Sequence, residues 1–395
     1  MALGEQTYGF FMPPVSLMGL GCAKETGLQA KILGATKVLI VTDAGLAKLG
    51  VAKTIQGYLQ AAGIAAVVFD GVEANPTEDN VRDGAKFYMQ NQCDGLVSVG
   101  GGSAHDSAKA IGVVTVHGGS IRDYAGVDRC SKALPPLICV NTTAGTAAEM
   151  TRVAVMTKPE THVKYIVADW RITPRVAIND PLLMVGLPPG MTAATGMDAL
   201  THAIEAYVSP FATPITDACA VKAIELIGQY LRPAVANGQN LEARDKMAYA
   251  EFLAGMACSN AMLGYVHALA HQLGAKFNLP HGVCNAICLP VVCEFIMIGD
   301  PKKFSDVAVA LGENIAGLSV VEAAEKGVAA MRKLSKDIGI PASFAELGVV
   351  STDVRTLAEG AMKEWVVTPR WATVEELMKL FYAVLAAPRA DAAAS

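Results

Sequence analysis

The stretch Gly95-Leu-Val-Ser-Val-Gly-Gly-Gly-Ser-Ala-His-Asp-Ser-Ala-Lys109 joins an apolar run to a helical pattern through three consecutive glycines. Gly95–Val99 is typical of a buried strand, and a helix is expected from about Ala104. Glycines let a backbone approach a phosphate closely, and a helix N-terminus favours negative charge. A tight strand–helix turn explains the glycines equally well, because the spacing is not GxGxxG.

The same alternation of apolar run and helical pattern recurs on both sides of this stretch. Helices are expected over Ala44–Ala62 and Thr77–Gln90, between predicted strands at Val38–Thr42, Ala65–Phe69 and Leu137–Asn141. Apolar runs with little polar alternation, joined by helices, predict a parallel sheet covered on both faces. Residues 151–180 differ, because three short β-like pieces with polar turns predict a small meander: Val153–Met156, Tyr165–Val167 and Val176–Ile178.

Leu187-Pro-Pro-Gly190 is the clearest break in the chain. After it the pattern is helical almost throughout, with helices expected over Thr192–Val208, Pro214–Tyr230, Glu242–Asn260 and Val266–Phe277, from His281, and in several further segments to Leu385. We therefore predict an α/β dinucleotide-binding domain over 1–187, an all-helical metal and substrate domain over 188–387, and a disordered tail over 388–395.

Composition excludes several classes of protein. The formal net charge is −5 and no basic stripe is present, so nucleic acid is not an expected partner. Nine cysteines without a CxxC pair are typical of reduced thiols, which predicts a cytoplasmic location. Mean hydropathy is +0.35, but the apolar stretch Ala286–Ile298 is too short for a membrane span and is interrupted by Pro290 and Glu294. Buried helices and a homodimer or larger homo-oligomer are expected instead.

Histidines and an aspartate recur at helical spacing in the second half. Asp198 and His202 lie four residues apart, and His267 and His271 repeat that spacing. His281 follows Pro280 and should open the next helix. Three helices could thus converge on one divalent cation, for which a carboxylate with imidazoles suits Fe²⁺ or Zn²⁺. Each residue taken singly is explained as well by polar contacts within helix packing, and the spacing does not decide which histidines are ligands.

The segment His267-Ala-Leu-Ala-His271 has the spacing of an HExxH motif, but Ala268 replaces its glutamate. A hydrolytic metal site needs a base for its water, so a metal-dependent hydrolase or lyase is disfavoured. A metal that holds an alkoxide while hydride passes to a cofactor needs no such base.

Two further segments indicate a dinucleotide. Thr142-Thr-Ala-Gly-Thr146 follows a predicted strand and could offer hydroxyls and amides to the same ligand, or could be a capped turn. Asp43 ends the first strand, where a carboxylate accepts from a ribose hydroxyl and repels a 2′-phosphate, which favours NAD over NADP. Asp43 could equally be the N-cap of the next helix.

At this point the chain resembles the iron-containing, group III alcohol dehydrogenases over essentially its whole length. The likeness rests on long ordered motifs: Val-Thr-Asp43-Ala-Gly-Leu, Glu73-Ala-Asn-Pro76, Gly100-Gly-Gly-Ser-Ala-His-Asp-Ser-Ala-Lys109, Thr142-Thr-Ala-Gly-Thr-Ala-Ala-Glu149, Ala194-Thr-Gly-Met-Asp-Ala-Leu-Thr-His-Ala-Ile-Glu205, His267 with His271, and Pro280-His-Gly282. It is nearest to the branch of NAD-dependent methanol dehydrogenase, lactaldehyde reductase and 1,3-propanediol dehydrogenase, and implies a dehydroquinate synthase-like fold.

The resemblance implies a role for each candidate residue. The metal ligands would be Asp198, His202, His267 and His281, with Fe²⁺ favoured and Zn²⁺ compatible, and His271 would act catalytically near the nicotinamide. NAD contacts are expected from Asp43, Asn75, Gly101, Gly102, Ser103, Asp106, Thr142, Thr143, Thr146, Lys164 and Leu183. The substrate pocket is expected to include Thr151, Val153, Cys258, Leu263 and Val367.

The resulting prediction is NAD-dependent oxidation of short-chain primary alcohols, of the methanol to butanol type, to aldehydes, and the reverse. Val153 replaces a polar residue of some relatives, which favours simple alcohols over a diol, polyol or lactaldehyde. A small alcohol or aldehyde is therefore the expected partner, and an activator protein is compatible with the methanol branch. A non-enzymatic nucleotide sensor is the remaining alternative, and it predicts NAD binding without turnover.

Overall fold

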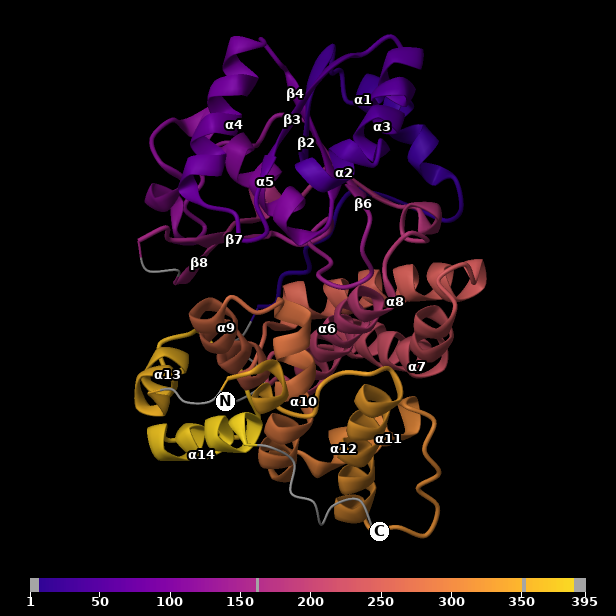
Figure 1. Ribbon diagram of the computed structural model, residues 1–395, viewed down its shortest axis with the longest axis vertical. Helices are drawn as coiled ribbons and strands as arrows, with labels where there is room; N and C mark the ends of the chain where they lie inside the picture. The colour runs from indigo at the N-terminus through magenta and orange to yellow at the C-terminus, as the bar shows by residue number, and fades with distance from the viewer. Residues whose placement is uncertain (1–6, 161–162, 350–352, 387–395) are drawn as a thin grey trace.

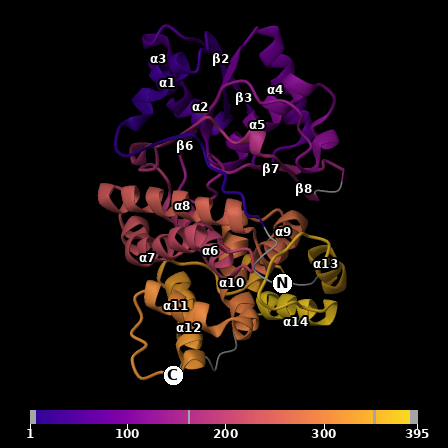
Figure 2. The same ribbon diagram turned by 180° about the vertical axis from the view of Figure 1, so that it is seen from behind.

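The computed structural model describes residues 7–160, 163–349 and 353–386. Figure 1 shows an α/β domain, indigo to magenta, above a helical domain that continues to the yellow C-terminal helices. Figure 2 shows the same two layers from behind, with helix α8 along their border in both views. The predicted fold class, a parallel-sheet α/β domain followed by a helical domain, is confirmed.

A six-stranded parallel sheet forms the centre of the α/β domain, in the order β1-β9-β6-β4-β2-β3. Its strands are β1 (Val15–Met18), β2 (Lys37–Asp43), β3 (Ala65–Val72), β4 (Gly95–Gly100), β6 (Leu137–Asn141) and β9 (Val176–Asn179). Alternate residues of β2 enter two separate apolar clusters, Leu39 on one face and Ile40 on the other. Burial of both faces explains why these strands are continuous apolar runs in the sequence.

Helices cover both faces of this sheet. Helices α1 (Thr26–Ile32) and α3 (Val51–Ala61) pack on one side, and α4 (Glu78–Gln90) and α5 (Gly102–His117) on the other. The single helix expected over Ala44–Ala62 is wrong, because α2 (Ala44–Lys48) ends before α3 begins. Gly50 causes the break: its φ is 82°, a left-handed conformation that ends one helix and starts another.

A second, three-stranded sheet lies beside the first, in the order β5-β8-β7. Strands β7 (Val153–Thr157) and β8 (Lys164–Ala168) are antiparallel, and β5 (Gly126–Val127) adds to β8. The expected meander was wrong in its third strand, because β9 lies in the main sheet between β1 and β6. All four β9 residues are buried, as expected of a central strand, and its neighbour β1 was not predicted.

The chain becomes helical at Pro189, close to the predicted boundary at 187, which stays a prediction. The helices are α6 (Pro189–Val208), α7 (Pro214–Ala236), α8 (Leu241–Ala261), α9 (Tyr265–Phe277), α10 (His281–Ile296), α11 (Pro301–Ala310), α12 (Val320–Asp337), α13 (Val354–Ala361) and α14 (Val374–Leu385). Short 3-10 turns are η1 (Cys22–Glu25), η2 (Ile121–Tyr124), η3 (Trp170–Ile172), η4 (Pro181–Leu183), η5 (Met297–Gly299) and η6 (Phe344–Leu347). The predicted tail, 388–395, lies outside the described residues.

Helix α10 continues through Pro290 and Glu294, the two residues that interrupt the apolar stretch in the sequence. Within the described residues, the helical run His281–Gly299 is long and apolar enough to cross a membrane by composition, and 56% of the tested window is buried inside the protein. Helices α8 and α9 pass the same test jointly but are bent by 103°. Cys284, Cys288 and Cys293 on α10 are buried free thiols, and burial is usual for free cysteine, which packs as a small apolar side chain.

Candidate metal and nucleotide site

Three helices bring one carboxylate and two imidazoles together. Ligand atoms of Asp198 on α6, His267 on α9 and His281 on α10 all lie within 4.8 Å of one another. Asp198 Oδ1 lies 3.6 Å from His281 Nε2 and 3.9 Å from His267 Nε2. Asp198 and His267 are each 2% exposed. The convergence of three helices predicted from the histidine spacing is therefore present.

His202 stands beside this triangle, one turn after Asp198 on α6. Its Nε2 atom lies 3.1 Å from His267 Nε2, and the two ring centroids are 4.6 Å apart. Burial lowers the pKa of His202 to about 4, and burial also lowers the pKa of His281 well below its usual value. Both imidazoles are thus neutral near pH 7, which is the form that binds a metal.

Glu205 orients His267 from behind. Its Oε2 accepts a hydrogen bond of 2.6 Å from His267 Nδ1, and its Oε1 accepts one of 2.7 Å from the backbone N–H of Val266. Burial disfavours a charged His267, but the Glu205 carboxylate outweighs burial and raises the pKa of His267. With its proton on Nδ1, His267 presents the lone pair of Nε2 to the cluster. We assigned no role to Glu205 from sequence, although it lies on the same helix face as His202.

Asn285 also faces the cluster, one turn after His281. Its Nδ2 donates to Asp198 Oδ1 at 2.6 Å and lies 3.1 Å from His267 Nε2 and from His281 Nε2. Its Oδ1 is buried without a hydrogen-bond partner. A half-turn of the amide would present this oxygen instead of the N–H groups. A buried carboxylate, neutral imidazoles and an amide that can reverse fit a divalent cation such as Fe²⁺ or Zn²⁺.

His271 occupies a different position from the other histidines. Its Nδ1 donates to Glu364 Oε2 at 2.8 Å, and the same carboxylate accepts from Gln272 Nε2 through Oε1. Its ring stacks on His281, with centroids 5.3 Å apart and planes 20° apart. His271 therefore lies at the edge of the cluster, with one nitrogen already engaged by a carboxylate that we did not single out from sequence.

The glycine turn, Gly100–Ser103, packs against the threonine loop, Thr142–Thr146. Helix α5 begins at Gly102, with Gly101 as its N-cap. A Cβ atom at Gly101 would lie 2.8 Å from Thr143 Oγ1, and one at Gly102 would lie 3.1 Å from Thr146 Oγ1. Side chains at these two positions would push the loop away. The two segments predicted to contact NAD thus form one surface, and glycine is required there for close packing.

The remaining nucleotide candidates have defined local partners. Asp43 is the N-cap of α2 and accepts from the backbone N–H of Leu46 at 3.0 Å, so its capping role is confirmed and its ribose role stays a prediction. Ser103 Oγ donates to the Ala74 carbonyl. Asp106 accepts from the backbone N–H of Val155, and burial raises its pKa to about 6. Leu183, in η4, packs on an apolar cluster of the sheet.

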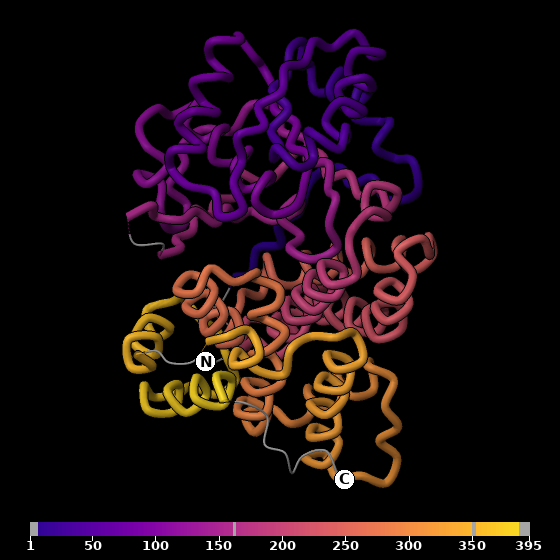
Figure 3. Tube along the Cα trace, in the orientation of Figure 1, coloured from indigo at the N-terminus to yellow at the C-terminus, as the bar shows by residue number. Residues whose placement is uncertain are grey.

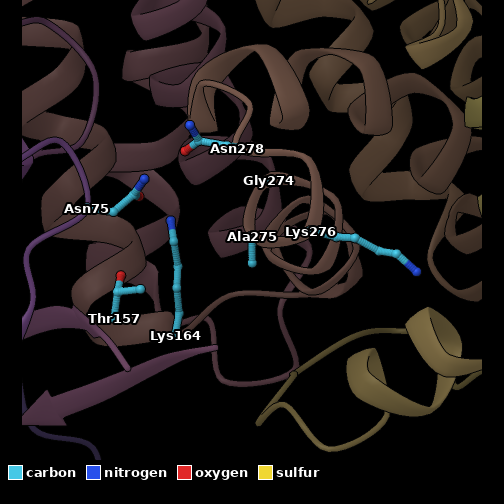
Figure 4. Close-up of a pocket in the computed structure, with 7 residues that line it drawn as sticks. All are labelled: Asn75, Thr157, Lys164, Gly274, Ala275, Lys276 and Asn278. Carbon is cyan, nitrogen blue, oxygen red and sulfur yellow. The ribbon is translucent and has the colours of Figure 1, made fainter. Parts of the chain in front are cut away.

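Lys164 faces the end of helix α9 across the border of the two domains. It lines a cavity of about 360 Å³ with Asn75, Thr157 and residues at the end of α9, namely Gly274, Ala275, Lys276 and Asn278. Figure 4 shows the Lys164 side chain extending toward Asn75 and Asn278, whereas Lys276 points away. Burial lowers the pKa of Lys164, although the charges of Asp198 and Asp106 act against it. Lys164 thus lines a cavity whose other walls come from the nucleotide candidate Asn75 and from α9, the helix that carries His267.

The predicted substrate-pocket residues form two contacting pairs and one buried thiol. Lys109 Nζ donates to Thr151 Oγ1 at 3.1 Å and to the Val153 carbonyl at 2.7 Å. The Val367 N–H donates to the Leu263 carbonyl at 2.9 Å. Cys258 lies on α8 with its thiol buried, and burial raises its pKa well above the usual value. Whether these residues surround one substrate stays a prediction.

A carboxylate–imidazole cluster beside a parallel sheet with a glycine turn is the arrangement expected of a metal-dependent dehydrogenase. Residues 13–181 match the family model described as "Iron-containing alcohol dehydrogenase", and residues 192–385 match "Fe-containing alcohol dehydrogenase family, C-terminal". The chain is 50% identical over 384 residues to a 1,3-propanediol dehydrogenase of Klebsiella pneumoniae, covering 96% of this chain and 99% of that protein.

Two further likenesses agree with this match. An NAD-dependent methanol dehydrogenase of Bacillus methanolicus is 46% identical over 373 residues, covering 94% of this chain and 98% of that protein. A crystal structure of a 1,3-propanediol oxidoreductase superposes with a TM-score of 0.95 at 50% identity, covering 96% of this chain and all of that one. This chain belongs to the iron-containing alcohol dehydrogenase family.

Membership confirms three of the sequence predictions: the family and its branch, an oxidoreductase acting on alcohols, and the class of cofactors. The metal agrees with the family name and with the donor cluster, and NAD agrees with the name of the methanol dehydrogenase relative. The roles of the individual residues stay predictions.

Proposed function

We propose that the protein oxidises short-chain primary alcohols, of the methanol to butanol type, to aldehydes with NAD, and catalyses the reverse reaction. The observation that supports this most is the position of Lys164. It lines a cavity with Asn75 of the α/β domain and with the end of α9, the helix that carries His267. Cofactor and metal would therefore act on one small substrate between the two domains.

When bound, the cation lowers the pKa of the substrate hydroxyl and the nicotinamide accepts hydride. Asp198, His202, His267 and His281 would hold the cation, and Glu205 keeps His267 in the tautomer that binds. The glycine turn and the threonine loop would hold the pyrophosphate by backbone N–H groups. His271 would take up the proton at its second nitrogen, since Glu364 engages the first.

The substrate preference rests on the pocket candidates. Val153, Leu263 and Val367 are apolar, and a hydrocarbon wall offers no partner to a second hydroxyl, which would then lose its hydrogen bonds to water. This favours simple alcohols. A diol is the second candidate substrate, because a 1,3-propanediol dehydrogenase is 50% identical in sequence to this chain.

A rate survey tests both candidates. The protein is reconstituted anaerobically with Fe²⁺ or Zn²⁺, and NADH formation is measured with methanol to butanol, 1,2- and 1,3-propanediol and glycerol, with matching aldehydes in reverse. We expect higher kcat/KM for the monohydric alcohols, by about tenfold for a lost buried hydrogen bond. A higher kcat/KM for a diol would replace the proposal by its alternative, and NAD binding without turnover would overturn both.

Substitution of two histidines, one in the donor cluster and one outside it, gives a test variant and a matched control. His267→Ala should abolish metal content and NADH formation, whereas His117→Ala removes an imidazole from α5 that contacts the Ser131 and Lys132 amides instead. Full activity of a metal-free His267→Ala protein would contradict the proposal. We also propose that the protein is cytoplasmic and homo-oligomeric, on the basis of its free thiols and apolar composition, and light scattering of the purified protein tests the second point.

A further inference from the structure

Two carboxyl groups that the proposed chemistry does not use lie buried against each other. Glu149 follows the threonine loop and Glu251 lies on α8, and both are 0% exposed. The Oε2 atom of each has no hydrogen-bond partner. Burial raises the pKa of both carboxyl groups, and the charge of Glu149 raises that of Glu251 further. Two buried carboxylates repel, which favours a proton on one of them.

Amides at the ends of two strands connect this pair to the sheet. Asn179, the last residue of β9, donates through Nδ2 to Glu149 Oε1 at 3.1 Å. Asn141, the last residue of β6, donates through Nδ2 to Glu251 Oε1 at 3.3 Å and to Asn179 Oδ1 at 2.8 Å. The carboxyl pair therefore joins the carboxyl edge of the sheet to α8, which runs along the border of the two domains in Figure 1.

Glu251 also holds the end of the threonine loop. Its Oε1 accepts a hydrogen bond of 2.6 Å from the backbone N–H of Ala147. Ala147 is buried and has a φ of 52°, a left-handed conformation that is strained for a residue other than glycine. One turn further along α8, a Cβ at Gly255 would lie 2.3 Å from the Ala147 Cβ. Helix α8 thus holds Ala147 in this conformation by a hydrogen bond from its N–H to Glu251 and by close packing at Gly255.

The loop held in this way contacts both predicted sites. Thr143 and Thr146 pack on the glycine turn, as described above. A Cβ at Gly145 would lie 2.7 Å from the Thr195 Cβ on α6, three residues before Asp198. Figure 3 shows the magenta chain of this region descending from the sheet onto the helices. A shift of residues 142–147 would therefore change the nucleotide surface and its distance from the metal donors.

We propose that Glu251 is a positioning residue for the cofactor: joined to Glu149 by one shared proton, it fixes residues 142–147 in the shape that receives the dinucleotide. This rests on the proposed function in one respect, that the loop binds NAD. Burial raises the pKa of both carboxyls, and the neighbouring Glu149 adds to the increase for Glu251, which therefore carries the proton. Its carbonyl oxygen then accepts from Ala147 while its O–H donates to Glu149.

Two substitutions separate this role from simple filling of space. Glu251→Gln keeps the shape, an oxygen for the Ala147 N–H and an N–H for Glu149, so it should retain the affinity for NAD within about twofold. Glu251→Leu has a similar volume but no polar atoms, so it should weaken NAD binding by about tenfold or more. Glu242→Leu, an exposed position in the first turn of α8, is the matched control.

Three measurements are made on the full-length protein: the dissociation constant for NAD by calorimetry, bound iron, and amide hydrogen exchange of the peptide covering residues 142–150 without cofactor. We expect faster exchange and weaker NAD binding in Glu251→Leu alone, with iron content unchanged. If that variant does not fold, Glu251→Asp, which keeps the acid but is one methylene shorter, should show the same loosened loop.

The outcomes distinguish the two proposals. Wild-type protein that binds NAD, together with Glu251→Leu or Glu251→Asp that binds it equally and exchanges equally slowly, would overturn the role of Glu251 and leave the proposed function intact. Equal losses in Glu251→Gln and Glu251→Leu would also overturn it. Wild-type protein that does not bind NAD would instead overturn the proposed function. It would also overturn the assumption that residues 142–147 bind NAD.

Discussion

Glu205 Oε2 lies 2.6 Å from His267 Nδ1, on the side of the imidazole away from the metal donors. Both residues are nearly fully buried. This contact decides which nitrogen of His267 carries the proton, and it is anchored by a second bond from the Val266 N–H to the same carboxylate. A ligand held in this way loses little freedom when it binds a cation.

Glu205→Gln should therefore weaken metal binding rather than abolish it. Glutamine can still accept from Nδ1 through its oxygen, but it brings no charge to strengthen the ligand. We expect an affinity for Fe²⁺ that is lower by about 10- to 100-fold, as for other partners of metal-binding histidines. Competition with a chelator measures this. Glu225→Gln, at a partly exposed glutamate paired with Lys222 on α7, is the control, and equal affinities in both variants would contradict the role of Glu205.

Asp43 should determine the choice between NAD and NADP. Its carboxylate caps α2 by accepting from Leu46, and we predict that its charge also repels a 2′-phosphate. Asp43→Asn keeps the cap and removes the charge, so the ratio of kcat/KM for NADP to that for NAD should increase by about tenfold or more. Asp43→Gly should increase it as well, at a cost of a few tenths of a kcal/mol in helix stability. An unchanged ratio in Asp43→Asn would show that Asp43 is a cap alone.

The elements that sequence could predict are those with a local signal. The strand at Leu137–Asn141 is a buried apolar run, and the helical positions of His267 and His281 follow from spacing alone. The place of β9 in the sheet could not be predicted, because strand order depends on pairing with β1 and β6 at long sequence separation. The break at Gly50 was missed because a single glycine within a helical pattern is often tolerated.

The site shows the same division. Asp198 and His202 were recognisable from their common helix face. Glu251 was not, because one glutamate in the middle of a helix is most often exposed. Only the fold brings it within 2.6 Å of the Ala147 N–H, 104 residues earlier in the chain. Glu364 was missed for the same reason, since its partner His271 lies 93 residues away.

The Glu149–Glu251 pair predicts how stability depends on pH. The folded pKa of Glu251 is raised above its usual value of 4.5, so the folded state holds a proton that the unfolded state releases. The stabilisation from this proton is fully present below the unfolded pKa and is lost as pH rises through the folded pKa. Among the groups that face the pair, Lys109 is the cation that acts on Glu149, whereas the amides of Asn141 and Asn179 are neutral. The nearby thiols of Cys139 and Cys258 have pKa values raised by burial.

Glu251→Gln should consequently change the pH dependence of unfolding. Its amide cannot ionise, so the free energy of unfolding of the variant relative to wild type should increase from about pH 6 to about pH 9. Urea unfolding at both pH values gives this difference, with Glu242→Gln on the exposed start of α8 as the control. A difference that stays constant or decreases with pH would mean that no shared proton stabilises the fold.

His271→Ala should separate chemistry from metal binding. His271 Nδ1 donates to Glu364, and its ring is stacked on His281 rather than pointing with it at Asp198. Removing this imidazole should leave the iron content near that of the wild type, because the Asp198, His267 and His281 donors are intact. The rate of NADH formation should decrease by about 10²- to 10⁴-fold, as expected for loss of a general base. Iron analysis and steady-state kinetics on the same preparation decide between the roles. Loss of iron in parallel with activity would instead identify His271 as a metal ligand and contradict its proposed role as the general base.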